Sequence, residues 1–158
     1  MIEIKAACDG LPFLTPRNGV GLPSMSPEDQ SALEMLAHTL VESWNRHDAD
    51  AYAANFAPEC TLVDLSGQIL SGRKEVRDEV SAMFAGRFSR SEATLGQIKL
   101  IEIAAGVAGV LTRCDLRGDA ANPGKVQRTR GTGAAVKRDG AWKFVTLHAG
   151  VLADYVLD

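Results

Sequence analysis

The amino-acid sequence predicts an α+β fold, in which helices from the first half of the chain pack on a mainly antiparallel sheet. Apolar residues recur at helical spacing from about residue 27, and the pattern changes to strand-like alternation from about residue 92. Helices followed by a run of strands are typical of α+β domains. A chain of 158 residues has the size of one such domain.

The composition excludes several classes of protein. The formal net charge is −3, so a broadly basic surface for nucleic acid is not expected. No apolar run approaches the roughly 18 residues of a membrane span, and the first residues do not resemble a secretory signal. Cys8, Cys60 and Cys114 lack the spacing of a disulfide framework or a zinc site. We therefore expect a cytoplasmic protein that binds neither nucleic acid nor membrane.

Residues 1–25 differ in composition from the rest of the chain. Segment 9–27 contains four of the six prolines and three glycines, which excludes a regular helix or a central strand. Its apolar residues leave two interpretations open, a mobile N-terminal arm or an ordered strap over a sheet edge or a neighbouring subunit.

Ser26 begins the regular structure. It has the position of an N-cap, with Pro27 next at the first helical position. The helix is predicted over about 27–46, with one apolar face, and a second short helix over about 49–57. Residues 60–70 read as a hairpin, after which Ser71 is expected to cap a third helix. The apolar face of the first helix consists of Leu33, Leu36, Leu40 and Trp44.

Four extended segments complete the predicted domain. They lie near 92–104, 107–117, 126–138 and 141–149, separated by turns rich in Gly, Asn and Asp. The domain is expected to span 26–150, with a C-terminal tail over 151–158. Such a sheet curls around the long first helix and leaves a cavity between them.

Several short motifs follow one another along the chain. They are 44–52 (WNRHDADAY), 56–60 (FAPEC), 64–67 (DLSG), 71–76 (SGRKEV), 130–132 (RGT), 138–144 (RDGAWKF) and His148. Each motif is weak alone, but their order and spacing together are fairly specific. They resemble the nuclear-transport-factor-2-like superfamily, in particular its SnoaL-like and SgcJ/EcaC-type branch, and the resemblance covers about 26–150.

This resemblance implies a cystatin-like roll, a cone-shaped sheet wrapped around the N-terminal helix, with a deep apolar pocket. It also implies a homodimer that associates through the sheet. The fold hosts isomerases, cyclases, dehydratases and non-catalytic binders, so it does not fix the function. Many members of the branch belong to natural-product pathways.

Asp64 is the foremost candidate for a catalytic base. It ends the apolar run 60–63, just before the Ser66–Gly67 turn, and a poorly solvated carboxylate there would suit proton abstraction. The resemblance places it where ketosteroid isomerases carry their proton-shuttling aspartate. The alternative is an aspartate that only caps the turn. The other isomerase positions fall near Leu40 and Thr132, which do not supply the phenol and acid, so we do not expect ketosteroid isomerase activity.

His148, near the end of the last strand, is the candidate proton donor or orienting group. The alternative is a partly buried histidine bonded to the backbone. The remaining histidines are dispersed without HxH or HExxH spacing, and no phosphate-binding glycine loop is present. We therefore predict neither a metal site nor a cofactor.

Two rows of alternating polar residues lie on neighbouring strands. If these rows face the cavity, Arg113 and Arg130 would bind a carbonyl or carboxylate group, with Thr132 beside them. If they face outward, they form a solvated or dimer surface. The rows are Arg113, Asp115 and Arg117 on one strand and Arg128, Arg130 and Thr132 on the next.

Trp44 is either a core residue or a surface on which a ligand stacks, and we count it among the substrate-binding candidates. The leading prediction is an enzyme that uses general acid/base catalysis on a small hydrophobic metabolite, as a polyketide cyclase, isomerase or dehydratase would. The alternatives are a ligand-binding module without chemistry and an association domain.

Overall fold

The computed structural model describes residues 25–152. Three helices and six strands follow one another in an order that agrees with the predicted helices-then-strands arrangement. They are α1 (Pro27–Asn45), α2 (Ala49–Ala53), β1 (Phe56–Val63), β2 (Ile69–Ser71), α3 (Arg73–Ala85), β3 (Glu92–Ala104), β4 (Val107–Arg117), β5 (Gln127–Arg138) and β6 (Ala141–Val151).

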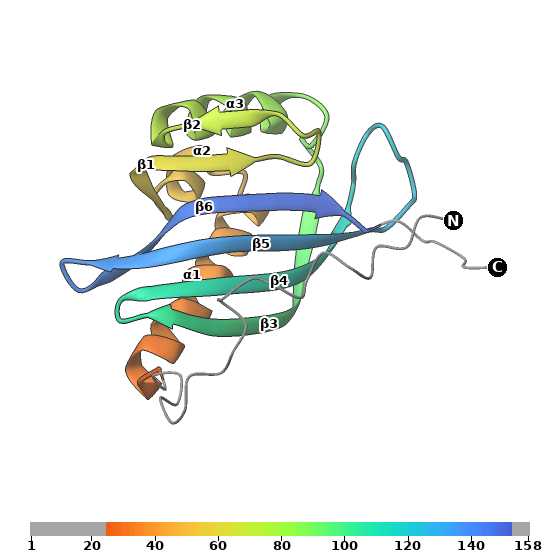
Figure 1. Cartoon of the computed structure of the whole chain (residues 1–158). Coiled ribbons are helices and arrows are strands. Elements are labelled where there is room, and N and C mark those ends of the chain that lie inside the picture. The colour runs from red at the N-terminus through yellow and green to blue at the C-terminus, as the bar shows by residue number, and fades with distance from the viewer. Residues whose placement is uncertain (1–24, 153–158) are drawn as a thin grey trace, which may run out of the picture.

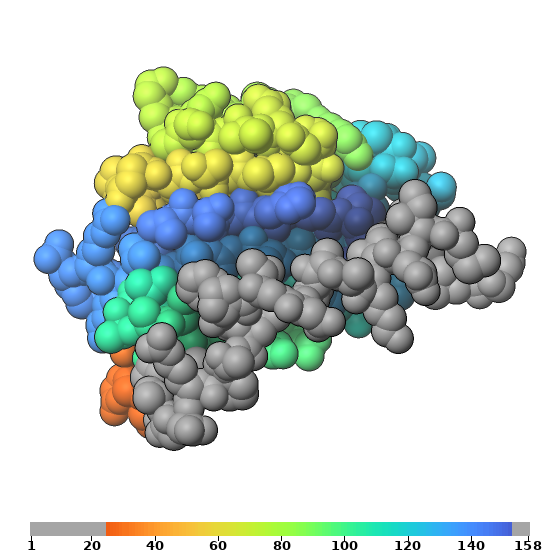
Figure 2. Space-filling view, viewed as in Figure 1, coloured from red at the N-terminus to blue at the C-terminus, as the bar shows by residue number. Residues whose placement is uncertain are grey.

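The strands form one curved, open sheet in the order β2-β1-β6-β5-β4-β3. Every neighbouring pair is antiparallel except β1 and β6, which run parallel. The helices all lie on the same face of the sheet, with α1 crossing behind β3–β6 in the view of Figure 1. Figure 2 shows the molecule from the opposite side of the sheet, in the same view. We call the face that carries the helices the inner face and the opposite one the outer face.

Helix α1 begins and ends close to the predicted positions because its caps are encoded locally. The Ser26 Oγ accepts a hydrogen bond from the Asp29 N–H at 3.1 Å, which confirms the predicted N-cap. At the other end, the Asn45 side chain both donates to and accepts from the backbone of Ala93. These two bonds attach the end of α1 to the edge strand β3.

Two local predictions are wrong. The second helix stops at Ala53 rather than near 57, because Phe56 already pairs with Phe144 as the first residue of β1. The predicted cap Ser71 belongs to β2, and Gly72 takes the N-cap position of α3 with a φ of +85°. The Gly72 N–H donates to the Cys60 carbonyl at 2.7 Å, so the sharp turn into α3 is fixed to β1.

The four long strands agree with the predicted segments to within two residues. The β5–β6 turn uses Asp139 and Gly140 at φ of +51° and +78°, as its Asp-Gly sequence indicates. The β4–β5 loop is attached to the end of α3, where the Arg87 guanidinium donates two hydrogen bonds, each 2.6 Å long, to the Asp119 carboxylate. These bonds fix the loop to the rest of the domain.

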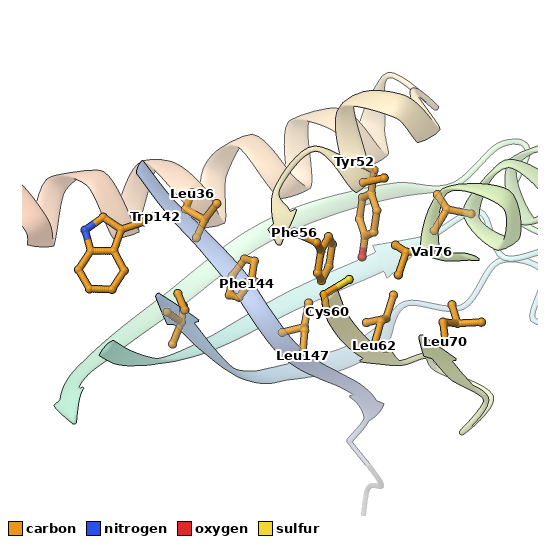
Figure 3. Packing of buried hydrophobic residues seen from close by; sticks show 14 of the residues in the cluster. Leu36, Tyr52, Phe56, Cys60, Leu62, Leu70, Val76, Trp142, Phe144 and Leu147 are labelled. Carbon is orange, nitrogen blue, oxygen red and sulfur yellow. The ribbon is translucent and has the colours of Figure 1, made fainter. Parts of the chain in front are cut away.

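The core fills the space between the inner face and the helices. Aromatic and aliphatic side chains from β1, β6 and α2 meet there, as Figure 3 shows for Tyr52, Phe56, Phe144 and Leu147. Within residues 25–152, no helix is both long and apolar enough to cross a membrane.

Candidate functional site

A cavity of about 110 Å³ remains between the helices and the inner face of the sheet. Most of its wall is apolar, and its polar groups are few. The lining consists of Ala37, Leu40, Val41 and Trp44 from α1, Tyr52 from α2, Leu62, Asp64 and Leu65 at the end of β1, Val80 and Met83 from α3, Ala93 from β3, Thr112, Cys114 and Leu116 from β4, Thr129 and Gly131 from β5, and Leu147 and Ala149 from β6.

Asp64 lies in this lining with only 5% of its surface exposed. Alternation along β1 explains its direction, because Cys60, Leu62 and Asp64 all lie on the buried side of the chain. The Oδ1 atom accepts hydrogen bonds from the Ser66 N–H, the Ser66 Oγ–H and the Gln68 N–H at 2.8, 2.7 and 2.9 Å. The turn-capping interpretation is therefore confirmed. Asp64 also lines the cavity, and its role as a base stays a prediction.

The second carboxylate oxygen of Asp64 has different surroundings. No hydrogen bond or ion pair within residues 25–152 uses Oδ2. The bonds to Oδ1 fix the orientation of the carboxylate, while Oδ2 keeps its lone pairs for another group. An oriented, buried carboxylate with one unused oxygen is suited to accept a proton.

Tyr52 supplies a phenol to the same cavity from α2. Its side chain is 8% exposed, and its hydroxyl points from the helix layer toward the sheet in Figure 3. The hydroxyl makes no hydrogen bond to any residue in the described part of the chain. Burial, with smaller contributions from Cys114 and Asp64, raises the pKa of the phenol well above its usual range. Tyr52 is therefore a hydrogen-bond donor at every physiological pH.

Trp44 packs against the core and also lines the cavity, and its role in binding a ligand stays a prediction. Its ring lies edge-on to Tyr52, Phe84 and Phe88, with centroid distances of 6.0, 5.0 and 5.5 Å. Its Nε1 is buried without a hydrogen-bond partner among residues 25–152. The aromatic contacts fix the indole against one wall of the cavity.

Small side chains on β4 and β5 make room for the cavity. Thr112 pairs with Gly131, and both lie in the lining. A Cβ at Gly131 would lie 2.6 Å from the Thr112 Oγ1, so the glycine accommodates this hydroxyl. Cys114 lies beside them, and burial raises the pKa of its thiol. This thiol stays protonated and behaves as a small apolar group.

His148 lies on the other side of the sheet from the cavity. Its neighbours on β6, Leu147 and Ala149, line the cavity, whereas His148 is exposed beside Thr132. The structure therefore does not bring His148 together with Asp64, although Val63 and His148 are paired in register. The physical reason is the register shift between Phe144 and Thr146, which moves the inward positions of β6 from Trp142 and Phe144 to Leu147 and Ala149.

The arginine rows also lie on the outer face. Arg113 is 46% exposed beside Asp115, with 3.8 Å between Arg113 Nη2 and Asp115 Oδ1. Arg130 is its cross-strand partner, and Thr132 follows on the same face. Neither arginine nor Thr132 lines the cavity, so the structure realises the second of the two predicted arrangements. The alternate residues of β5 that include Thr129 and Gly131 have small side chains or none, and they line the cavity instead.

Tyr52 is the main residue of the cavity that the sequence analysis did not propose. Its ring belongs to the core cluster, while its hydroxyl serves the cavity. One signal in the sequence pointed to Tyr52. Leu40 lines the cavity but cannot donate a hydrogen bond, and a phenol on the next helix can supply a donor to the same cavity. Within residues 25–152, no group of three or more His, Cys, Asp and Glu side chains is placed to hold a metal ion.

Comparison with known proteins agrees with this architecture. Residues 37–145 match the family model of the SnoaL-like domain. A search of curated proteins finds no match.

Among solved structures, an uncharacterised Caulobacter vibrioides protein with a cystatin-like fold has a TM-score of 0.73 and 22% identity, covering 80% of this chain and 92% of that one. A candidate scytalone dehydratase from Novosphingobium aromaticivorans has a TM-score of 0.69 and 16% identity, covering 83% and 90%. A type 2 hexachlorocyclohexane dehydrochlorinase has a TM-score of 0.70 and 13% identity, covering 83% and 93%. At these identities the similarity shows the fold.

Proposed function

Since the chain belongs to the SnoaL-like branch of the nuclear-transport-factor-2-like superfamily, we propose that it is a cofactor-independent acid/base enzyme acting on a small hydrophobic metabolite. One observation carries the proposal. Asp64 and Tyr52 are each more than nine-tenths buried, line the same apolar cavity and keep one polar atom without a partner in the described part of the chain. A substrate bound in the cavity would supply the hydrogen-bond partner that each of these atoms lacks.

The two groups support a defined reaction. The Asp64 carboxylate would take a proton from a carbon next to a carbonyl group, and the C–H electron pair would move toward the carbonyl oxygen. The Tyr52 hydroxyl would donate a hydrogen bond to that oxygen as its negative charge grows. Return of the proton to another carbon gives an isomerisation, and departure of a group on the adjacent carbon gives an elimination.

Elimination is the form that we favour. Two solved structures of similar fold carry the names of a dehydratase and a dehydrochlorinase, and both names describe eliminations. Within this proposal, the substrate is a metabolite of the polyketide or natural-product type that the sequence resemblance implies.

Hydrogen–deuterium exchange tests the base without knowledge of the natural substrate. A panel of enolisable ketones that includes acetophenone is incubated with the protein in D₂O, and proton NMR follows the loss of the α-proton signal. We expect the wild-type protein to accelerate exchange, and Asp64→Asn to reduce the enzymatic rate by about 100-fold or more. Asp115→Asn, the same change on the outer face, should leave the rate unchanged.

Equal exchange rates in the wild-type and Asp64→Asn proteins would refute Asp64 as the base. The second candidate function is ligand binding without chemistry, favoured by the structural role of Asp64 in its turn. It predicts that ketones bind in the cavity without any accelerated exchange.

A further inference from the structure

The charge of the cavity differs from the charge of the outer face. No Lys, Arg or His is among the cavity-lining residues within 25–152, and Asp64 is the one lining residue that carries a charge at neutral pH. The arginines of β4 and β5 lie on the opposite face of the same strands. A ligand in the cavity is therefore separated from these cations by the sheet itself.

The turn that follows Asp64 binds its carboxylate, and no cation within residues 25–152 pairs with it. Three hydrogen bonds, from Ser66 and Gln68, reach Oδ1. A second negative charge in the same apolar cavity would lose its hydration and face the unused oxygen of Asp64. The described lining contains no cation that would offset the repulsion from Asp64.

A cationic ligand is also a poor match. An ammonium group would approach Asp64 but would need acceptors for its other N–H bonds, and it would leave the Tyr52 hydroxyl without an acceptor. The unpaired donor of Tyr52 instead requires a ligand that carries a lone pair. A carbonyl, ether or hydroxyl oxygen meets this requirement.

We propose that the cavity selects uncharged ligands that carry a hydrogen-bond acceptor, with Asp64 excluding anions and Tyr52 binding the acceptor. The inference rests on the proposed function, which it deepens by naming the class of substrate. It assigns to Asp64 a role in selectivity in addition to its role as base. It also excludes the carboxylate ligands that an arginine clamp would favour.

Three probes of one ring size separate the ligand classes. A cavity of about 150 Å³ admits benzene, and this one measures about 110 Å³, so the probes are limited to a single ring. The probes are acetophenone, which is neutral with one acceptor, benzoate, which is anionic, and benzylamine, which is cationic. Each is titrated at pH 7 into the full-length, ¹⁵N-labelled protein. The reporters are the backbone N–H of Gly131 and the indole N–H of Trp44, both in the cavity lining.

We expect acetophenone to bind at least tenfold more tightly than benzoate or benzylamine. Asp64→Asn should reduce the preference for acetophenone over benzoate to less than threefold, because the repelling charge is gone. Tyr52→Phe should weaken acetophenone binding about three- to tenfold. The control Arg113→Ala removes a cation from the outer face and should leave all three affinities unchanged.

Benzoate binding within threefold of acetophenone, tighter binding of benzylamine, or no cavity shifts with any probe would overturn the inference. A weaker affinity for benzoate in Arg113→Ala would also overturn it. These results measure binding alone. The role of Asp64 as the base is tested separately, by the exchange experiment. Conversely, loss of exchange activity in a protein that still prefers neutral ligands would refute the catalytic role and keep the selectivity.

Discussion

Tyr52 shows how one side chain combines a core ring with a cavity-facing hydroxyl. The ring packs among Trp44 and Phe56, whereas the hydroxyl has no partner in the described part of the protein. In a purely structural role, this hydroxyl would lose hydration without gaining a hydrogen bond. Its presence is typical of a site where stability is given up for binding.

Removal of this hydroxyl provides a first prediction. Tyr52→Phe should leave the free energy of unfolding unchanged or raise it by up to about 1 kcal/mol, because no protein hydrogen bond is lost. The same variant should slow α-proton exchange about tenfold or more. Thr129→Val is the control, since the Thr129 hydroxyl donates to the Cys114 carbonyl at 3.2 Å, and its loss should destabilise by about 1 kcal/mol. Urea unfolding of the three proteins gives the comparison. A loss of more than about 1 kcal/mol in Tyr52→Phe would contradict the assignment.

Gly118 provides a second prediction at this scale. Its φ is +75°, and an added Cβ would lie 2.0 Å from the Arg90 carbonyl oxygen. Gly124 has nearly the same φ, +73°, with open space around it. Gly124→Ala should cost about 1–2 kcal/mol for the backbone conformation alone, and Gly118→Ala about 1–3 kcal/mol more for the clash. Similar melting temperatures for the two variants would show that the backbone at Arg90 moves away from the added Cβ without a loss of stability.

Strands β4 and β5 show what the sequence could and could not predict about an element. Alternation predicts that Arg113 shares a face with Asp115, and Arg130 a face with Thr132, and the structure confirms both pairings of faces. Alternation does not say which face is inside. The face with more apolar side chains is usually the inner one. This rule fails here because the inward residues of β5 include Gly131 and Thr129, whose small size leaves the cavity open.

The helix ends were predictable where a local signal exists. Ser26 caps α1 through its own side chain, so the sequence is sufficient there. Phe56 starts β1 because of its pairing with Phe144, a partner 88 positions along the chain that no local pattern reveals. The same holds for His148, whose exposure depends on the register of β6 within the sheet.

The β4–β5 loop gives a prediction about pH. Two hydrogen bonds from Arg87, and others from Ala121 and Asn122, hold the pKa of the buried Asp119 well below its usual range. A lowered carboxyl pKa stabilises the fold above the unfolded-state value of about 3.9, and this contribution is lost as the pH falls toward the folded-state value. Asp119→Asn should therefore destabilise the protein at pH 7 and flatten the pH dependence of stability below pH 4.

The control for this loop is an exposed ion pair. Asp78→Asn breaks contacts with Lys74 and Arg77 that are open to solvent, so its effect on stability at pH 7 should be much smaller than that of Asp119→Asn. Thermal unfolding between pH 2 and 7 measures both variants. Parallel pH profiles for the wild-type and Asp119→Asn proteins would show that the loop anchor does not depend on this charge.

At the scale of the whole molecule, the curved sheet and the helices create a cavity that neither layer contains alone. The sequence predicted the architecture and the presence of a cavity, since the order of helices and strands determines both. It identified Asp64 and Trp44 as lining residues. It did not identify Tyr52 as a donor, because the apolar spacing of a core residue and of a cavity residue is the same.

We propose that the chemistry occurs in this cavity, between Asp64 and Tyr52. A crystal structure of the protein with a bound neutral ketone would test this placement. We expect the ketone inside the cavity, with its oxygen about 2.6–3.2 Å from the Tyr52 hydroxyl and its α-carbon against the free oxygen of Asp64. A ketone bound instead on the outer face, beside Arg113 and Arg130, would contradict it.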